Sequence, residues 1–259
     1  MQIAITRGVG AGIAACELTH LKRQVIDLDR ARAQHRTYEE ALARAGCRVE
    51  SLPALDDLPD SVFVEDVAVV LDEIAVVTRP GAVSRRPETA QIAPVLSTYR
   101  RVTFIQAPGT LDGGDVLRLG RRIFVGQSGR SNESGIEQLR AVAWPYGYTV
   151  TAVPVSGCLH LKSAVTEAAP GVVLVNPLWV DATAFGDVRA MEIDPAEPYA
   201  ANGLFVGDRL IYPTSFPRTQ RRLEAAGIDV DAVDVSELQK AEGAVTCCSL
   251  VFSNQTRPD

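Results

Sequence analysis

One structural unit recurs along this chain: a β-hairpin, a loop, an amphipathic helix and a further strand. In the clearest copy, a buried strand at 67–71 turns at Asp72-Glu73 and returns through 74–77. A helix over 89–99 follows, with Pro87 at a tolerated position near its start, and then a strand at 102–105. Short runs of apolar and β-branched residues around a two-residue turn are typical of a buried hairpin. The unit therefore predicts a small sheet with one covering helix.

Three further copies follow, and a fifth is complete only when the two ends of the chain are joined. The second has strands at 115–119, 122–125 and 149–153 with a helix over 133–143; the third has strands at 163–166 and 171–175, a weak helix and an irregular stretch at 194–198. The fourth has strands at 203–206, 209–212 and 230–235 with a helix over 217–226. The fifth joins 248–252 to 2–6, a helix over 29–45 that stops at Gly46, and a strand at 47–52.

Five such copies predict a closed ring of ββαβ repeats, an α/β propeller with five blades around a central pocket. Closing the ring leaves few unprotected sheet edges. A doubly wound α/β sheet is the alternative, but its strands would alternate singly with helices, whereas here they come in hairpins. No segment has the composition of a linker, so residues 1–259 are expected to form a single domain. Functional side chains are then expected at the starts and ends of the hairpins.

Charge and cysteine usage exclude several classes of protein. A net charge of -6 and a pI of about 5.2 give no basic surface for nucleic acid. The most apolar region, 67–77, is interrupted by Asp72 and Glu73, so no membrane span is expected, and the N-terminus lacks a signal pattern. The five cysteines are scattered without a Cys-x-x-Cys pair, which argues against a disulfide scaffold or a zinc site. A cytoplasmic protein with reduced thiols and no cofactor is expected.

A cysteine and a histidine are the first candidates for chemistry. Cys247 follows a segment of small residues and is expected to lead into a strand, where adjacent side chains face opposite sides; Cys247 and Cys248 then cannot share a role. His160 precedes the third hairpin, whereas His20 and His35 lie in charged surroundings and are expected to be solvated. Each residue alone is more often an ordinary core residue, but a nucleophile and a base with an orienting group form a catalytic set.

Acids and arginines flank the same hairpins. Asp112 precedes two glycines, which is either ordinary turn chemistry or a carboxylate beside a glycine backbone that must pack close to a ligand. Glu65 and Asp66 interrupt an apolar run and would cradle a guanidinium; alternatively one is solvated and the other pairs with a structural arginine. Arg85 and Arg130 occupy equivalent places in two repeats and together could hold an α-carboxylate, although each alone is more often a surface residue.

These residues fall in motifs that resemble the dimethylarginine dimethylaminohydrolase family of the guanidino-group-modifying (pentein) superfamily, whose fold is a five-bladed α/β propeller. The resemblance runs nearly end to end and is far more specific than any single motif. The matching segments are 62–70 (VFVEDVAVV), 78–82 (TRPGA), 84–86 (SRR), 111–117 (LDGGDVL), 124–126 (FVG), 159–163 (LHLKS) and 246–249 (TCCS).

The resemblance implies a role for ten residues. It makes Cys247 the nucleophile, His160 the general acid and base, and Asp112 the carboxylate beside it, a position that is Glu in many relatives. It also implies a set of substrate contacts: Asp60, Glu65 and Asp66 as polar groups, with Asp66 facing the guanidinium, Arg85 and Arg130 as the α-carboxylate clamp, and Leu18 and Ala241 through their backbone carbonyls. Leu18 falls in the region 8–20, which matches poorly and would form a mobile loop over the pocket.

The implied reaction is hydrolysis of a methylated free arginine to citrulline and methylamine or dimethylamine, through a thiouronium intermediate on Cys247. A free thiol is only a few per cent ionised at pH 7, so the substrate's own cation is expected to generate the thiolate. Sibling reactions on the same fold, namely arginine deimination, citrulline hydrolysis and amidino transfer, are the alternatives, as is a binding protein without chemistry. No metal is required, the partner is a small molecule, and a monomer or homodimer is expected.

Overall fold

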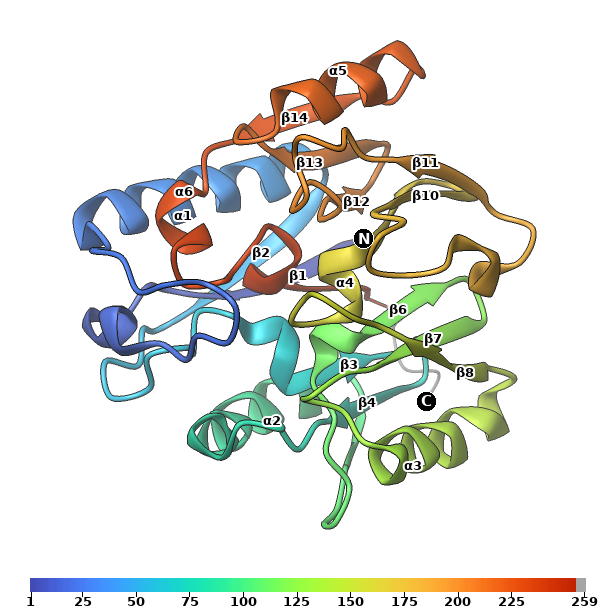
Figure 1. Cartoon of the computed structure of the whole chain (residues 1–259). Helices are drawn as coiled ribbons and strands as arrows, with labels where there is room; N and C mark the ends of the chain where they lie inside the picture. The colour runs from blue at the N-terminus through green and yellow to red at the C-terminus, as the bar shows by residue number, and fades with distance from the viewer. Residues whose placement is uncertain (255–259) are drawn as a thin grey trace.

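The computed structural model describes residues 1–254 and contains five three-stranded sheets arranged in a ring (Figure 1). In every sheet the middle strand pairs antiparallel with one neighbour and parallel with the strand that follows the next helix. The sheets, each written with its middle strand in the centre, are β15 (Leu250–Ser253), β1 (Gln2–Arg7), β2 (Cys47–Leu52); β3 (Ala68–Val70), β4 (Ile74–Val77), β5 (Arg101–Phe104); β6 (Val116–Leu119), β7 (Arg122–Gln127), β8 (Thr149–Pro154); β9 (Val165–Ala169), β10 (Val172–Val175), β11 (Arg189–Glu192); β12 (Leu204–Val206), β13 (Arg209–Pro213), β14 (Val230–Val233).

The helices cover the outside of the ring and make the parallel crossovers (Figure 1). Helix α1 shows why the sequence forms them: Asp27 caps its N-terminus by accepting the Arg30 N–H, and its apolar stripe is buried. Gly46, with a φ of 88°, turns the chain into β2. The crossover elements are α1 (Leu28–Arg44), α2 (Thr89–Ser97) after the 3₁₀ helix η3 (Val83–Glu88), α3 (Glu133–Ala143) before η5 (Trp144–Tyr146), η6 (Ala182–Phe185) and α5 (Pro217–Ala225).

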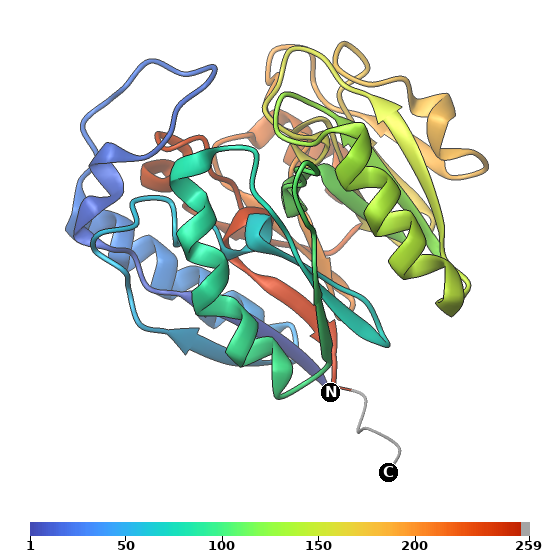
Figure 2. The ribbon, with the colours of Figure 1, turned by 90° about the horizontal axis from the view of Figure 1, so that it is seen from below.

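The two ends of the chain close the ring within one blade, as predicted. Strand β15 pairs antiparallel with β1, and the Asn254 N–H donates to the carbonyl of Met1 over 2.9 Å. Figure 2 shows the N-terminus beside the last strand of the chain. The hydroxyl groups of Tyr38 in α1 and Ser249 before β15 are 2.7 Å apart in the core of this blade. The circular arrangement of the repeats is therefore confirmed, and the doubly wound alternative is wrong.

The first strands of the five repeats, β3, β6, β9, β12 and β15, line a cavity of about 420 Å³ on the ring axis. At one end of this axis each repeat enters its first strand through a tight turn. Four of these turns are short helices: η2 (Val64–Val67), η4 (Gly113–Asp115), α4 (Leu161–Ala164) and η7 (Thr246–Cys248). The expectation that functional residues gather at the starts of the hairpins is tested at these turns.

Several local expectations were wrong. Cys247 and Cys248 lie in η7 rather than in a strand, because Asn202 bonds both the N–H and the hydroxyl of Thr246 and holds a turn there. Strand β15 therefore begins only at Leu250. His35 is buried rather than solvated, since it lies on the face of α1 that packs inward. In the third repeat the weak helix is the four-residue η6, capped by Asp181.

Two small helices complete the chain, η1 (Ala11–Ala15) before the long loop that leads into α1, and α6 (Ser236–Gln239) after β14. Among the described residues no helix is long and apolar enough to cross a membrane.

Strand β1 joins the two ends of the chain in one sheet, since it pairs with both β15 and β2. Ile5 is fully buried in β1 between β15 and β2. We expect Ile5→Ala to lower the free energy of unfolding by about 2–5 kcal/mol, because the truncation leaves a cavity in a packed core. The matched control is Val25→Ala, at a side chain that is 89% exposed, with an expected change below about 0.5 kcal/mol. Urea denaturation measures both, and equal effects would contradict the burial of Ile5 between β15 and β2.

Candidate active site

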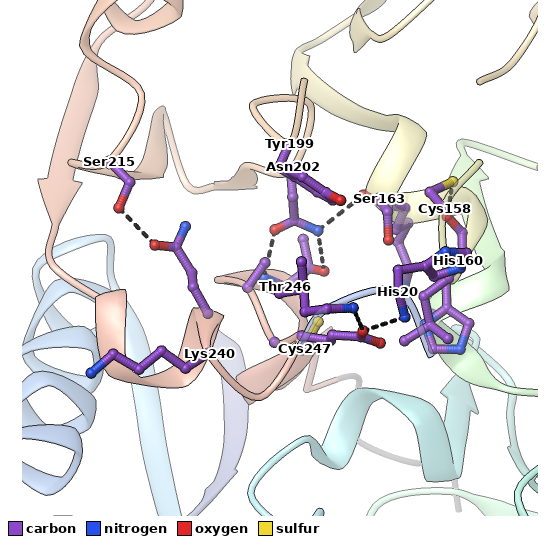
Figure 3. A pocket seen from close by; sticks show the side chains of 18 of the residues that line it. His20, Cys158, His160, Ser163, Tyr199, Asn202, Ser215, Lys240, Thr246 and Cys247 are labelled. Atoms are coloured by element: carbon purple, nitrogen blue, oxygen red, sulfur yellow. Dashed lines mark hydrogen bonds between the residues drawn. The ribbon is translucent and has the colours of Figure 1, made fainter. Parts of the chain in front are cut away.

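The turns at one end of the axis bring the predicted catalytic residues together around one cavity. Glu65 and Asp66 lie in η2, Asp112 and His160 are the N-cap residues of η4 and α4, and Cys247 lies in η7. A cavity of about 380 Å³ is lined by Glu65, His160 and Cys247 (Figure 3). A hollow of about 20 Å³ adjoins it, lined by His160 and Cys247 together with Asp60, Asp66, Arg85, Arg130 and Ala241. Residues from repeats far apart in the sequence therefore share one site.

His160 is held by a buried carboxylate. Its Nε2 atom lies 3.0 Å from Oδ2 of Asp112, and its Nδ1 atom lies 3.8 Å from Oδ1 of Asp66. Burial alone would lower the pKa of His160, but the charges of Asp66, Asp112 and Asp115 act in the opposite direction and raise it to about 9. The imidazole is therefore protonated at neutral pH, as a proton donor must be before it acts.

Asp66 is paired with a buried arginine. The Arg85 guanidinium donates to Asp66 and to both oxygens of Glu88, and also to the carbonyls of Asp60 and Phe63. Burial would raise the pKa of Asp66, but the charges of His160 and Arg85 outweigh burial and lower the pKa below its ordinary value. The carboxylate therefore stays ionised. The sequence left open that one of the two adjacent acids pairs with a structural arginine, and Asp66 is that acid. Because most of the Arg85 N–H groups are already engaged, its role as an α-carboxylate clamp stays a prediction.

Glu65 forms the floor of the cavity instead of being solvated. Its carboxylate accepts from Lys162 Nζ over 2.5 Å and from the Thr246 hydroxyl over 2.8 Å. Glu65, Lys162 and Thr246 line both this cavity and the larger axial one, so they form the partition between the two. Asn202 extends the partition by donating to the Lys162 carbonyl and the Thr246 hydroxyl. A direct contact of Glu65 with substrate stays a prediction.

The two adjacent cysteines differ in the way that the sequence predicts. Cys247 is half-buried and lines the cavity, whereas Cys248 is fully buried and its thiol donates to the Ala244 carbonyl. Burial, followed by the charges of Glu65 and Asp66, raises the pKa of Cys247 to about 12. Cys247 is therefore a protonated thiol in the empty site.

The two glycines after Asp112 let the backbone pack against the site. A Cβ atom on Gly113 would lie 1.9 Å from the Glu65 carbonyl oxygen. One on Gly114 would lie 2.6 Å from both Asp66 Oδ1 and His160 Nδ1, and the Gly114 N–H donates to Asp66 over 3.0 Å. This backbone is closely packed, Gly113 against the Glu65 carbonyl and Gly114 against the side chains of Asp66 and His160, while its close approach to a ligand stays a prediction.

The loop between η1 and α1 lies over the cavity and carries Leu18. Its Glu17 N–H donates to Asp60 over 3.1 Å, and Arg130 donates to the Thr19 hydroxyl over 3.0 Å. The Leu18 side chain packs against the core beside these contacts. Ala241 is buried in the same core cluster and lines the hollow. The structure thus places Ala241 at the site, whereas Leu18 lines neither cavity and lies only in the loop beside it; their carbonyl contacts with a substrate stay predictions.

No protein-family model matches the chain. The N(G),N(G)-dimethylarginine dimethylaminohydrolase of Streptomyces coelicolor is 42% identical over 248 residues, which is 95% of this chain and 95% of that protein. The enzyme of the same name from Pseudomonas aeruginosa is 36% identical over 87% of this chain and 90% of that protein. The chain belongs to the dimethylarginine dimethylaminohydrolase family. A solved structure of the Pseudomonas aeruginosa enzyme, a cysteine-to-serine variant complexed with citrulline, has a TM-score of 0.92 and 34% identity, covering 96% of this chain and 98% of that one.

Family membership and the five sheets together establish the pentein fold, a five-bladed α/β propeller. The hydrogen bonds of the site also include polar residues that the sequence patterns did not single out as functional. Asp115 accepts from the Leu161 N–H and from the hydroxyls of Ser128 and Ser131, and Ser131 in turn accepts the Asp112 N–H. Asp115 thus joins the turn of Asp112 to the turn of His160. The sequence could have indicated a role for Asp115 only through its position in the same motif as Asp112.

The donor atoms of Asp66, Asp112 and His160 lie within 4.8 Å of one another, a spacing that a metal ion would require. These atoms already bond elsewhere, since His160 is bound to Asp112, and Asp66 is bound to Arg85 and Gly114. A metal ligand must be neutral imidazole, whereas the raised pKa keeps His160 protonated at neutral pH. The three residues therefore suit proton transfer better than metal binding, and the absence of a metal requirement stays a prediction.

The raised pKa of Cys247 predicts slow alkylation of the empty enzyme. Because only the thiolate reacts, we expect the rate with iodoacetamide to rise about tenfold for each pH unit from 7 to 10, without a plateau. Mass spectrometry of the peptide that contains Cys247 measures the rate, and Cys247→Ser corrects for labelling of Cys248. A fast reaction at pH 7 that levels off would contradict the protonated thiol.

The close packing at Gly114 predicts that a glycine-to-alanine substitution there lowers the free energy of unfolding much more than the same substitution at Gly129. Gly114→Ala places a methyl group against Asp66 and His160 and is expected to lower the free energy of unfolding by about 1–3 kcal/mol. Gly129→Ala enters open space and is the control, with an expected change within about 1 kcal/mol of zero and of stabilising sign. Thermal or urea denaturation compares them, and equal stabilities would contradict the packing described for Gly114.

Proposed function

We propose that the protein hydrolyses Nω-methylated free arginine to citrulline and methylamine or dimethylamine, with Cys247 as the nucleophile and His160 as the general acid and base. One observation carries the proposal: in a chain of this family, His160, which is held by buried Asp112, and the Cys247 thiol line the same hollow as ionised Asp66. A nucleophile, an oriented proton donor and an anion for a cationic substrate are the parts that such a reaction needs.

The charges around the cavity favour a cationic ligand. Asp60 is buried beside the hollow and its carboxylate is bonded to the Glu17 N–H, while Glu65 and Asp66 already have Lys162 and Arg85 as partners. In the proposed complex Asp66 faces the guanidinium and Asp60 the α-ammonium group. Arg130 and Arg85 hold the α-carboxylate, Leu18 and Ala241 offer their carbonyls, and Glu65 completes the polar contacts.

In the proposed first step, the Cys247 thiol loses its proton to solvent as the guanidinium binds, Sγ attacks the guanidinium carbon, and the carbon–nitrogen bond to the methylated nitrogen breaks. The departing amine takes its proton from His160, which begins the cycle protonated. A thiouronium remains on sulfur. His160, now neutral, accepts one proton from a water that attacks the same carbon. The carbon–sulfur bond then breaks, and the remaining proton of that water moves from the new hydroxyl group to sulfur, which releases citrulline and restores the thiol. Asp112 keeps the imidazole oriented through both transfers.

The cost of ionising Cys247 is larger than the sequence alone indicates. With a pKa of about 12, half ionisation at pH 7 requires about 7 kcal/mol. A guanidinium about 4 Å away, at an effective dielectric of 20, contributes about 4 kcal/mol, or roughly a thousandfold in the ionisation constant. The substrate cation also neutralises the charge of Asp66, which is one cause of the raised pKa. Substrate binding therefore favours the thiolate, and attack and ionisation are expected to be coupled.

The sibling reactions of arginine deimination, citrulline hydrolysis and amidino transfer remain the alternative, because they use the same three catalytic groups. We propose that the whole chain works as one catalytic domain, as a monomer or homodimer, on a small molecule and without a cofactor. A cytoplasmic location stays a prediction from the sequence.

The deciding experiment measures citrulline release from asymmetric dimethylarginine, monomethylarginine and arginine side by side. We expect turnover of the two methylated substrates, little with arginine, and a loss of at least about a thousandfold in Cys247→Ala, because the covalent step is removed. Cys248→Ala is the matched control, since it deletes an adjacent thiol that faces the core, and it is expected to retain activity.

Rapid turnover of arginine with ammonia release would favour a deiminase. Inertness of all three substrates would refute the proposed substrate while leaving the fold unaffected. Equal activity of wild type and Cys247→Ala would refute the proposed nucleophile.

A further inference from the structure

A single carboxylate binds three consecutive backbone N–H groups of the loop that covers the site. Glu242 accepts from the N–H groups of Thr19 over 3.0 Å, His20 over 2.5 Å and Leu21 over 2.5 Å. The two segments are more than 220 residues apart in the sequence. Hydrogen bonds to an ionised acceptor are stronger than those between neutral groups, and here one side chain satisfies three adjacent donors.

This contact lies at the mouth of the candidate active site. Glu242, His20 and Leu21 line the active-site cavity of about 380 Å³, and Glu242 also lines the hollow beside Asp60 and Arg130. Figure 3 shows His20 among the side chains that surround this cavity, near His160 and Cys247. The loop segment that Glu242 binds therefore covers this cavity, and it follows Leu18 directly in the sequence.

The backbone at Glu242 is unfavourable for a side chain. Its φ is 58°, the one positive value among the non-glycine residues that the structure describes, and glycine would adopt it without steric cost. Strained residues of this kind persist where the surrounding structure enforces them, and they cluster at functional sites. The following residue, Gly243, packs against the ring of Phe63, which fixes the chain at this point. The strain aims the carboxylate at the loop.

We propose that Glu242 is a positioning residue that latches the loop at Thr19–Leu21 over the active site, so that the substrate-binding conformation exists before substrate arrives. The proposal rests on the proposed function for its kinetic part, and on geometry alone for the latch. Other contacts anchor the ends of the loop: Asp60 binds the Glu17 N–H, and Glu237 binds the Asp27 N–H over 2.9 Å. Glu242 holds the stretch between them.

The expected kinetic effect falls on KM. If the closed loop is the binding-competent state, the apparent affinity falls in proportion to its population. Loss of the latch that leaves one molecule in ten closed raises KM about tenfold, whereas kcat changes by less than about threefold because bound substrate restores the closed loop. A defect in the catalytic groups themselves would lower kcat instead.

Glu242→Gly is the decisive variant, because it removes the carboxylate and relieves the positive φ together. Relief of the positive φ offsets part of the loss of the three hydrogen bonds, so its melting temperature is expected to stay within about 5 °C of the wild type, and thermal denaturation checks that the variant is folded at the assay temperature. Glu242→Gln keeps an acceptor oxygen without the charge and is expected to recover part of the effect. Asp56→Gly is the matched control: Asp56 accepts a single N–H, from Ala11 at the start of η1 over 2.7 Å, and lines neither cavity.

Two readouts separate the latch from the proposed reaction. Hydrogen–deuterium exchange of the peptide covering residues 16–24 needs no substrate, and it is expected to be at least about tenfold faster in Glu242→Gly, with Glu242→Gln between them and Asp56→Gly unchanged. Steady-state kinetics with asymmetric dimethylarginine gives KM and kcat. Unchanged exchange would overturn the latch even if the enzyme is active. Faster exchange with an unchanged KM would overturn the positioning role. If the wild type lacks activity, the proposed function fails, while exchange still decides the latch.

Discussion

The buried carboxylate of Glu65 is the contact on which the geometry of the site depends. It receives Lys162 from the repeat of β9 and Thr246 from the repeat of β15, so three blades meet at one charge. A buried ion that loses its partner leaves an uncompensated charge, which costs about 3–5 kcal/mol. The blades therefore cannot shift independently at this end of the axis. The same contact sets the depth of the cavity, because it separates it from the axial space beneath.

With the blades fixed in this way, the electrostatics of the site follow from the carboxylates around it. They raise the pKa of His160 to about 9, and burial together with these charges raises that of Cys247 to about 12, so both groups hold their protons in the empty site. Such a site is poorly reactive until a cation enters. A guanidinium placed beside Asp66 cancels part of the negative potential and favours the thiolate, while His160 keeps the proton that the leaving amine needs. Activation is thus coupled to the charge of the ligand.

The sequence predicts the parts of this structure that depend on local patterns. Alternating hairpins and helices give the blades and the circular closure, and the predicted helix at 133–143 matches α3 from end to end. Local patterns do not contain the partners of buried charges. That Arg85 is held by Asp66, or that Asn202 keeps Cys247 in a turn instead of a strand, depends on contacts between separate segments of the chain. Glu242 could not have been found from its neighbours in the chain for the same reason.

The repeat explains why such distant residues converge. Each of the five blades enters its first strand through a turn at the same end of the axis, and each turn contributes a different group: Asp66, Asp112, His160, Asn202 and Cys247. A ring of equivalent positions brings five side chains to one point without any change to the blades that carry them. The chemistry resides in the turns, which sheet pairing does not constrain. The turns do not cover the opening of the cavity, so a loop outside the repeat must do so. The hydrogen bonds that Glu242 accepts from that loop hold it in place.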